Sequence, residues 1–225
     1  MIDVQKALNE YNKYIKNYNI KDDKIALKVA HMLRVKENSK NIAQSLNLET
    51  EDVELAELIG LLHDIGRFEQ VKRYNTFVDK NSVNHGAFGA KILFEDGLSE
   101  REMLHAKIIR DADKLDIFNV ALKEKPEAVY ESEHLEKETF TDEIFREFMN
   151  NEQLDYSKIK THADVVICHF RYVFDLNYKY SFQVVNENKY LERLYKRIHF
   201  ENQDTQKQLE TIYNTANNYL KKNIL

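Results

Sequence analysis

Cysteine, proline, glycine and tryptophan are scarce in this chain of 225 residues. It has one cysteine, Cys168, one proline, Pro126, five glycines and no tryptophan. A single cysteine excludes an intramolecular disulfide and suits a reducing compartment. So few residues that interrupt regular backbone favour long helices. No stretch alternates in polarity for long enough to predict a sheet, and the best strand candidate is "FDLNYKYSFQVV", residues 174–185.

The chain also lacks a long apolar run and a strong excess of one charge. A helix that spans a bilayer needs ~20 apolar residues, and no run approaches that length. The first residues lack the apolar segment of a signal peptide. Basic residues number 33 and acidic residues 38, mixed along the chain, for a net charge of −5. We therefore expect a cytoplasmic protein with no membrane partner and no dedicated nucleic-acid binding.

Apolar residues recur at helical spacing through most of the chain, which predicts an all-α protein. Thr50 is expected to cap a helix that is apolar almost all round, the pattern of a buried central helix, and Gly66 is expected to end it. The other expected elements are helices over residues 3–18 and 21–46, with a weak point at 38–41; a loop over 67–84; a short helix over 85–95; a long helix from Ser99 to about 124; short helices over 127–160; and two or three helices over 161–222. The length fits a helical core over residues 1–125 and a helical extension over 126–225, packed as one compact unit.

Several ionisable residues fall on the apolar faces of these predicted helices. His63 and Asp64 stand at the end of the most apolar predicted helix, where a buried carboxylate is costly unless it is paired, hydrogen-bonded or bound to a metal. His31 lies in the second predicted helix, and Asp111 and Asp113 interrupt the long one. Residues two positions apart along a helix point in directions ~200° apart, so Asp111 and Asp113 cannot both face one small site.

Together these residues form a candidate metal-binding set from three helices. Imidazole and carboxylate ligands suit Mn, Fe, Co, Ni, Zn or Mg ions. Such an ion would neutralise buried carboxylates and leave positions open for water or a phosphate oxygen. The residues alone leave an alternative open, because a lone buried histidine is often a hydrogen-bonded core residue.

His31, the run "LIGLLHDIGR" (58–67) and the run "IRDADKLD" (109–116) together resemble the metal signature of the HD-domain phosphohydrolase superfamily. The order and the rough spacing agree over about residues 20–120. The resemblance implies an all-α HD-type core that binds a divalent ion and hydrolyses a phosphomonoester or phosphodiester. The substrate would be a small phosphorylated molecule, such as a nucleotide or a related metabolite. The implied metal ligands are His31, His63, Asp64 and Asp113.

The same resemblance implies roles for neighbouring residues. The family pattern around the last ligand selects Asp113. Asp111 then packs behind the ligands or within the helix contacts, and Asp116 orients a ligand or contacts substrate. Asp64 is also implied in catalysis. Asp116 lies one turn beyond Asp113 on the same side of the helix.

"HDIGR" also resembles the HDIGK subset of the superfamily, which includes the HD-GYP branch. The basic residue contacts phosphate there, so Arg67 is implied as a catalytic and substrate-binding residue. Lys114 and Arg73 are further candidate phosphate contacts, with solvated positions as the alternative. "HGAFGAKIL" (85–93) resembles a later part of that branch, and His85 is then a candidate ligand of a second ion. The alternative for His85 is a histidine near solvent at the start of a helix.

Two departures from the branch limit this prediction. Only 27 residues separate His85 from Asp113, and the GYP tripeptide is absent, which disfavours cyclic-dinucleotide hydrolysis. Arg67 stands where some nucleotidase branches carry a glutamate, so the general base is not assigned. His105 lies on a different helical face from Asp113 and is expected to be structural. The alternative function is a non-catalytic module that keeps a metal or nucleotide as a structural or sensing ligand.

Overall fold

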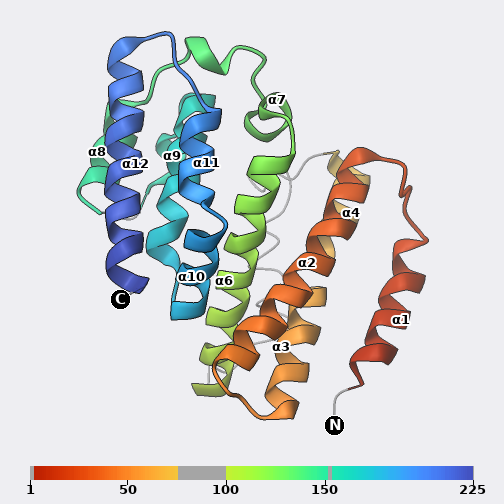
Figure 1. The fold of residues 1–225 in the computed structure, drawn as a ribbon. Helices are drawn as coiled ribbons and strands as arrows, with labels where there is room; N and C mark the ends of the chain where they lie inside the picture. The colour runs from red at the N-terminus through yellow and green to blue at the C-terminus, as the bar shows by residue number, and fades with distance from the viewer. Residues whose placement is uncertain (1–2, 76–99, 152–153, 225) are drawn as a thin grey trace. The chain divides into compact units, whose positions relative to one another are not determined.

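The computed structural model describes residues 3–75, 100–151 and 154–224, and within these ranges the protein is all-α, as predicted, with no strand (Figure 1). Its α-helices are α1 (Val4–Ile15), α2 (Asp23–Ser45), α3 (Thr50–Leu62), α4 (Gly66–Tyr74), α6 (Glu100–Lys123), α7 (Pro126–Tyr130), α8 (Asp142–Met149), α9 (His162–Arg171), α10 (Lys179–Glu187), α11 (Tyr190–Arg197) and α12 (Gln203–Ile224). Short 3-10 helices occupy Leu135–Lys137, Tyr156–Lys158 and Tyr172–Asp175. No helix in the described ranges is both long enough and apolar enough to cross a membrane.

The strand candidate over residues 174–185 is wrong. Most of it lies in α10, where Phe182 and Val185 are buried at helical spacing. The number of helices in the tail was also underestimated, since the chain from residue 162 onward forms four α-helices, α9 to α12. The predicted long helix is confirmed as α6, and short helices do occur within residues 127–160, separated by non-helical segments.

The expected weak point at residues 38–41 does not interrupt α2. The Ser39 hydroxyl donates to the Val35 carbonyl at 2.7 Å, and the Asn38 amide donates to the Ala112 carbonyl at 3.2 Å. These polar side chains are therefore satisfied without breaking the helix. The expected cap at Thr50 is wrong, because Glu49 holds the N-cap position of α3 without a side-chain hydrogen bond and Thr50 is the first helical residue.

The chain around Gly66 differs most from the prediction. Helix α3 already ends at Leu62, and Gly66 begins α4 where a loop was expected. Phe68 and Val71 of α4 are buried one helical turn apart in a cluster with α1 and α2 residues, which explains why this polar stretch is helical. Asn75 ends α4 in the left-handed region, at φ 51°. The rest of the predicted loop, the helix over 85–95 and Ser99 lie outside the described residues.

The chain divides into two compact units, Met1–Asp116 and Ile117–Leu225, and the division falls inside α6. The predicted boundary after residue 125 lies just beyond the end of that helix.

In the first unit α2 lies along α3, and α1 and α4 pack against this pair (Figure 1). Gly60 permits the close approach of α2 and α3, because a Cβ atom there would lie 2.5 Å from the Ser39 Oγ and 3.0 Å from the Lys36 Cα. This contact fixes the end of α3, from which His63 projects, against the helix that carries His31.

In the second unit α12 packs against α8, α9, α10 and α11. Aromatic rings line the contact of α12 with α10, where the ring centroids of Phe182 and Tyr219 lie 6.1 Å apart. They also line its contact with the 3-10 helix Tyr172–Asp175, where the centroids of Phe174 and Tyr219 lie 4.5 Å apart. Helix α9 begins with a capping box formed by Thr161 and Asp164. This unit is held mainly by apolar packing, because α7, α8, α10 and α11 have no side-chain hydrogen bond at their N-caps.

Candidate metal centre

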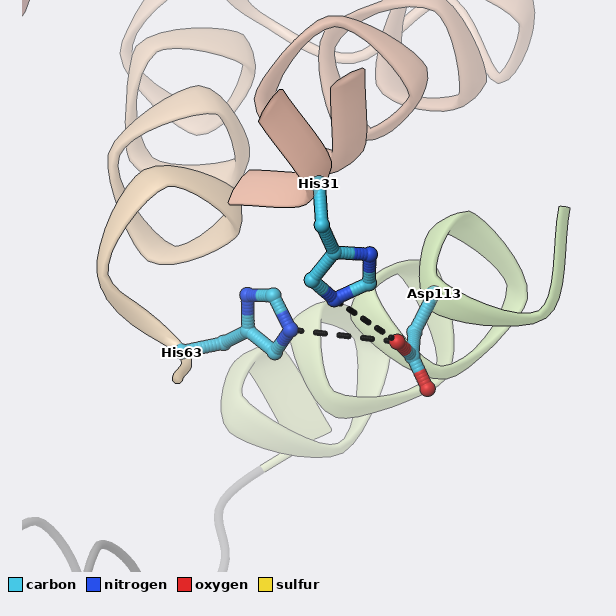
Figure 2. Close-up of side chains that lie close together, drawn as sticks. All are labelled: His31, His63 and Asp113. Atoms are coloured by element: carbon cyan, nitrogen blue, oxygen red, sulfur yellow. Dashed lines mark ion pairs between the residues drawn. The ribbon is translucent and has the colours of Figure 1, made fainter. Parts of the chain in front are cut away.

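Three of the predicted ligands, His31, His63 and Asp113, converge in the first unit (Figure 2). His31 comes from α2, His63 directly follows α3, and Asp113 comes from α6. Asp113 Oδ1 lies 3.4 Å from His31 Nε2 and 3.8 Å from His63 Nε2. All three ligand atoms lie within 4.8 Å of one another. One small ion between them would therefore reach ligands from three helices.

The other ring nitrogen of each histidine is already engaged. His63 Nδ1 lies 3.0 Å from the Gly60 carbonyl oxygen, which can only accept, so this Nδ1 carries the proton. His31 Nδ1 lies 2.8 Å from Asp116 Oδ2 and donates to that carboxylate. Both rings thus turn Nε2 toward Asp113, and in the neutral form of each ring this nitrogen offers a lone pair.

These two Nε2 atoms are buried, and neither has a hydrogen-bond partner in the described part of the chain. A buried nitrogen lone pair without a partner is costly, and two that converge beside a carboxylate are the donor set of a divalent ion. Burial also lowers the pKa of His63, so the ring stays in the neutral form that offers this lone pair. The residues present therefore fit a bound metal.

Asp116 holds His31 from behind and is itself fixed by Arg34. It is 1% exposed and accepts hydrogen bonds from Nε and Nη2 of Arg34, the latter at 3.0 Å. Burial raises the pKa of Asp116, but the hydrogen bonds from His31 and Arg34 outweigh it and lower the pKa below its usual value. Sequence reasoning missed Arg34, although it follows His31 by three residues and so lies on the same face of α2.

Asp64 is shared between the histidines and a lysine. Its Oδ2 lies 3.7 Å from the Nε2 of both His31 and His63, and 2.5 Å from Lys28 Nζ. Burial raises the pKa of Asp64, but the Lys28 ammonium and the neighbouring His63 and Arg67 lower it far below its usual range. Asp64 is therefore a carboxylate. Lys28 was also missed; it lies three residues before His31, on the same face of α2, but its contact with Asp64 depends on how the helices pack.

The predicted phosphate contacts lie close to these ligands. Arg67 Nε is 3.8 Å from Asp64 Oδ1, and Arg67 Nη1 donates to Gln70 Oε1 at 2.6 Å. Lys114 Nζ is 3.6 Å from Asp113 Oδ2. Both cations therefore flank predicted ligands.

The remaining candidates lie elsewhere or outside the described residues. Asp111 is fully buried, while Asp113, two positions along α6, faces the histidines. His105 is buried with its Nε2 3.2 Å from Asp52 Oδ1, a pairing that agrees with its expected structural role. Arg73 lies in α4, but its side chain is not among those described. His85 lies outside the described residues, so the second-ion prediction stays a prediction.

Comparison with protein families gives a match to a known domain. A family model described as HD domain matches residues 29–180, more than half of the chain. The matched stretch contains His31, His63, Asp64 and Asp113. No curated protein and no solved structure matches the chain.

Proposed function

The chain belongs to the HD domain family, and from that membership and the geometry of its site we propose that it is a metal-dependent phosphohydrolase. Its proposed substrate is a phosphomonoester or phosphodiester of a nucleotide or a related small metabolite. The observation that carries the proposal is the pair of buried Nε2 atoms, on His31 and His63, that converge on Asp113 without a hydrogen-bond partner in the described residues. A fold supports many functions, so the function is proposed from this site and not from the fold.

In this proposal His31, His63 and Asp113 hold the ion, with Asp64 as the fourth ligand. When bound, a divalent ion polarises a phosphoryl oxygen and lowers the pKa of a coordinated water from ~15.7 towards ~7. Asp116 keeps the His31 ring oriented through the 2.8 Å hydrogen bond to Nδ1. The Gly60 carbonyl does the same for His63.

Arg67 and Lys114 would offset the negative charge of the phosphoryl group. Each lies within 4 Å of a predicted ligand carboxylate, Arg67 beside Asp64 and Lys114 beside Asp113. A guanidinium suits a phosphoryl group because its planar fork can donate two parallel hydrogen bonds. Cations beside a divalent ion would repel it, so they contribute only when an anion lies between.

A second candidate function is a non-catalytic module that binds a metal or a nucleotide as a structural or sensing ligand. The ion pair between Lys28 and Asp64 favours the nucleotide-binding form of this module, because an ammonium 2.5 Å from Oδ2 balances the charge of Asp64 without a bound ion. In that case the site would hold its ligand without turning it over.

Elemental analysis and an ester screen together separate these functions. Protein purified without chelator and without nickel affinity resin should carry about one equivalent of a divalent ion per chain. When that ion is added, the protein should hydrolyse members of a panel of phosphate esters. The Asp64→Ala variant should show lower metal content and lower hydrolysis together. Metal content below ~0.1 equivalent with no uptake on addition would contradict the metal site. Bound metal with no turnover of any ester would favour the non-catalytic module.

A further inference from the structure

Arg34 reaches the candidate metal site through another residue. It follows His31 by three residues and so lies on the same face of α2. Its Nε donates to Asp116 Oδ1, and its Nη2 donates to Asp116 Oδ2 at 3.0 Å. The same Oδ2 accepts from His31 Nδ1 at 2.8 Å. A continuous series of contacts therefore runs from the guanidinium, through the carboxylate, to the imidazole whose Nε2 faces Asp113.

The contact between Arg34 and Asp116 has two hydrogen bonds, which restricts the carboxylate more than one would. The planar guanidinium donates to both oxygens at once, so the carboxylate cannot rotate without losing at least one of these bonds. Asp116 is 1% exposed, so water does not readily replace a lost donor. A guanidinium only donates, so both oxygens act as acceptors here. Asp116 Oδ2 is thus held in place to accept the His31 Nδ1–H group.

The same contact also ties α2 to α6. One helical turn further along α2, the Asn38 amide donates to the Ala112 carbonyl at 3.2 Å. Asn38 lies four residues after Arg34, and Ala112 lies four residues before Asp116, so the two contacts are spaced equally on both helices. These contacts set which residues of α2 and α6 face each other. They therefore support the position of His31 opposite Asp113 as well as the orientation of its ring.

We propose that Arg34 is a positioning residue of the metal site, which acts through Asp116 to hold the His31 imidazole with Nε2 directed at the ion. The inference rests on the proposed metal site and adds a residue that does not itself contact the ion. Partners behind a histidine ligand orient it, and their loss typically lowers metal affinity by ~10- to 100-fold. The alternative is that Arg34 only stabilises the fold by compensating the buried Asp116 carboxylate.

Three variants separate positioning from stability. Arg34→Gln removes the guanidinium and keeps a polar side chain, while Arg34→Lys keeps the charge without the planar fork. Lys36→Gln is the matched control on the same helix, because it also removes a cation from a buried carboxylate. Lys36 pairs with Glu57 at 2.7 Å, and Glu57 is 7% exposed. Circular dichroism and urea denaturation measure the folding and stability of each variant.

Metal affinity, measured by competition with a chromophoric chelator, is the first test. Arg34→Gln should lower it by ~10-fold, the lower end of the range for residues behind a ligand, and Arg34→Lys should recover part of the loss. Lys36→Gln should leave it unchanged even if stability falls.

A double variant tests whether Arg34 acts through Asp116. The chain with both Arg34→Gln and Asp116→Asn should bind metal no more weakly than the chain with Asp116→Asn alone, because the two residues act as one unit. Wild-type affinity in Arg34→Gln, an equal loss in Lys36→Gln, or additive losses in the double variant would overturn the positioning role.

Nuclear magnetic resonance of the metal-free protein, labelled with 15N histidine, tests the same contact without the ion. The proton on His31 Nδ1 should exchange slowly with water, because it is donated to a buried carboxylate, and its signal is assigned by its loss in His31→Gln. The signal should weaken or disappear in Arg34→Gln and persist in Lys36→Gln. The proton on His63 Nδ1, which is donated to the Gly60 carbonyl, should persist in both and is the internal control.

An unchanged His31 signal in Arg34→Gln would overturn the inference. If the wild-type protein takes up no metal, the proposed metal site fails, whereas this signal still decides whether Arg34 orients His31 through Asp116.

Discussion

Asp64 in the first unit and Asp164 in the second are both buried carboxylates, and they are used in opposite ways. Asp164 is fully buried and accepts hydrogen bonds from the Thr141 amide and hydroxyl and from the amides of Lys160 and Thr161. Asp64 is 6% exposed and instead faces the Lys28 ammonium and two imidazole nitrogens. A carboxylate that accepts its full set of hydrogen bonds from nearby backbone and hydroxyl donors stabilises the fold. A carboxylate that faces possible metal-ligand atoms is a candidate member of a binding site.

The histidines of the two units differ in the same way. His169 is buried in the second unit with Nδ1 3.2 Å from the Tyr130 hydroxyl. His31 and His63 each engage Nδ1 and leave a buried Nε2 without a hydrogen-bond partner in the described chain. Burial of an ionisable group therefore does not identify a site by itself. Ligand atoms that remain open and converge do identify one.

The largest effect should come from Asp113→Asn, which removes the carboxylate on which both open nitrogens converge. Loss of a ligand should cost more than the ~10- to 100-fold typical of residues behind a ligand, so metal uptake and hydrolysis should fall below detection. Asp111→Asn is the control and should mainly lower the unfolding temperature. Metal content that survives the first change and is lost in the second would show that the wrong face of α6 was assigned.

Arg67→Ala should leave metal content unchanged and still damage turnover. In the proposed function Arg67 donates to the phosphoryl group, so its loss should raise KM, lower kcat or both by ~10- to 1,000-fold, the cost of one or two charge-assisted hydrogen bonds. Arg67→Lys should recover part of the loss, because charge returns without the planar fork. Steady-state kinetics at matched metal occupancy check this. Equal rates in the three proteins would assign the phosphate contact to other residues.

Asp116→Asn should weaken metal binding without abolishing it. The change removes the negative charge that orients His31 through Nδ1 and that pairs with Arg34. Metal affinity should fall by ~10- to 100-fold, as is typical when a partner behind a histidine ligand is lost. Competition with a chromophoric chelator measures the change. Wild-type affinity in the variant would mean that packing alone orients the His31 ring.

Asp164→Ala should separate stability from function in the second unit. It removes four acceptor contacts and a capping box, so the free energy of unfolding should drop by ~1–3 kcal/mol or more. Metal content per folded chain should not change. Urea denaturation and elemental analysis, run beside Asp64→Ala, test the contrast. Metal lost in Asp164→Ala while the protein remains folded would break the distinction between the two carboxylates.

The smallest effect should be seen at Cys168, the only cysteine of the chain. It is 3% exposed, and burial raises the pKa of its thiol to about 12. At pH 8 iodoacetamide should hardly modify the folded protein, because the thiolate is the reactive form, and it should modify the denatured chain readily. Mass spectrometry before and after denaturation measures the difference. Fast labelling of the folded protein would show that this part of the second unit opens in solution.

The sequence alone determined the helical class and the positions of the metal-ligand candidates. Helical periodicity is a local property, so α1, α2 and α6 were predicted well from it. The pair His63–Asp64 stood out because polar groups at the end of an apolar helix need a compensating partner. The resemblance to the HD superfamily selected Asp113, and the family match over residues 29–180 confirms that resemblance.

Only the tertiary structure showed how these residues are held. Lys28 pairs with Asp64 across 36 positions, and Asp116 binds His31 across 85 positions. No local spacing encodes contacts over such separations, because they arise when α2, α3 and α6 pack together. The same packing made α4 a helix, since burying Phe68 and Val71 outweighs the weak helical signal of a short polar stretch.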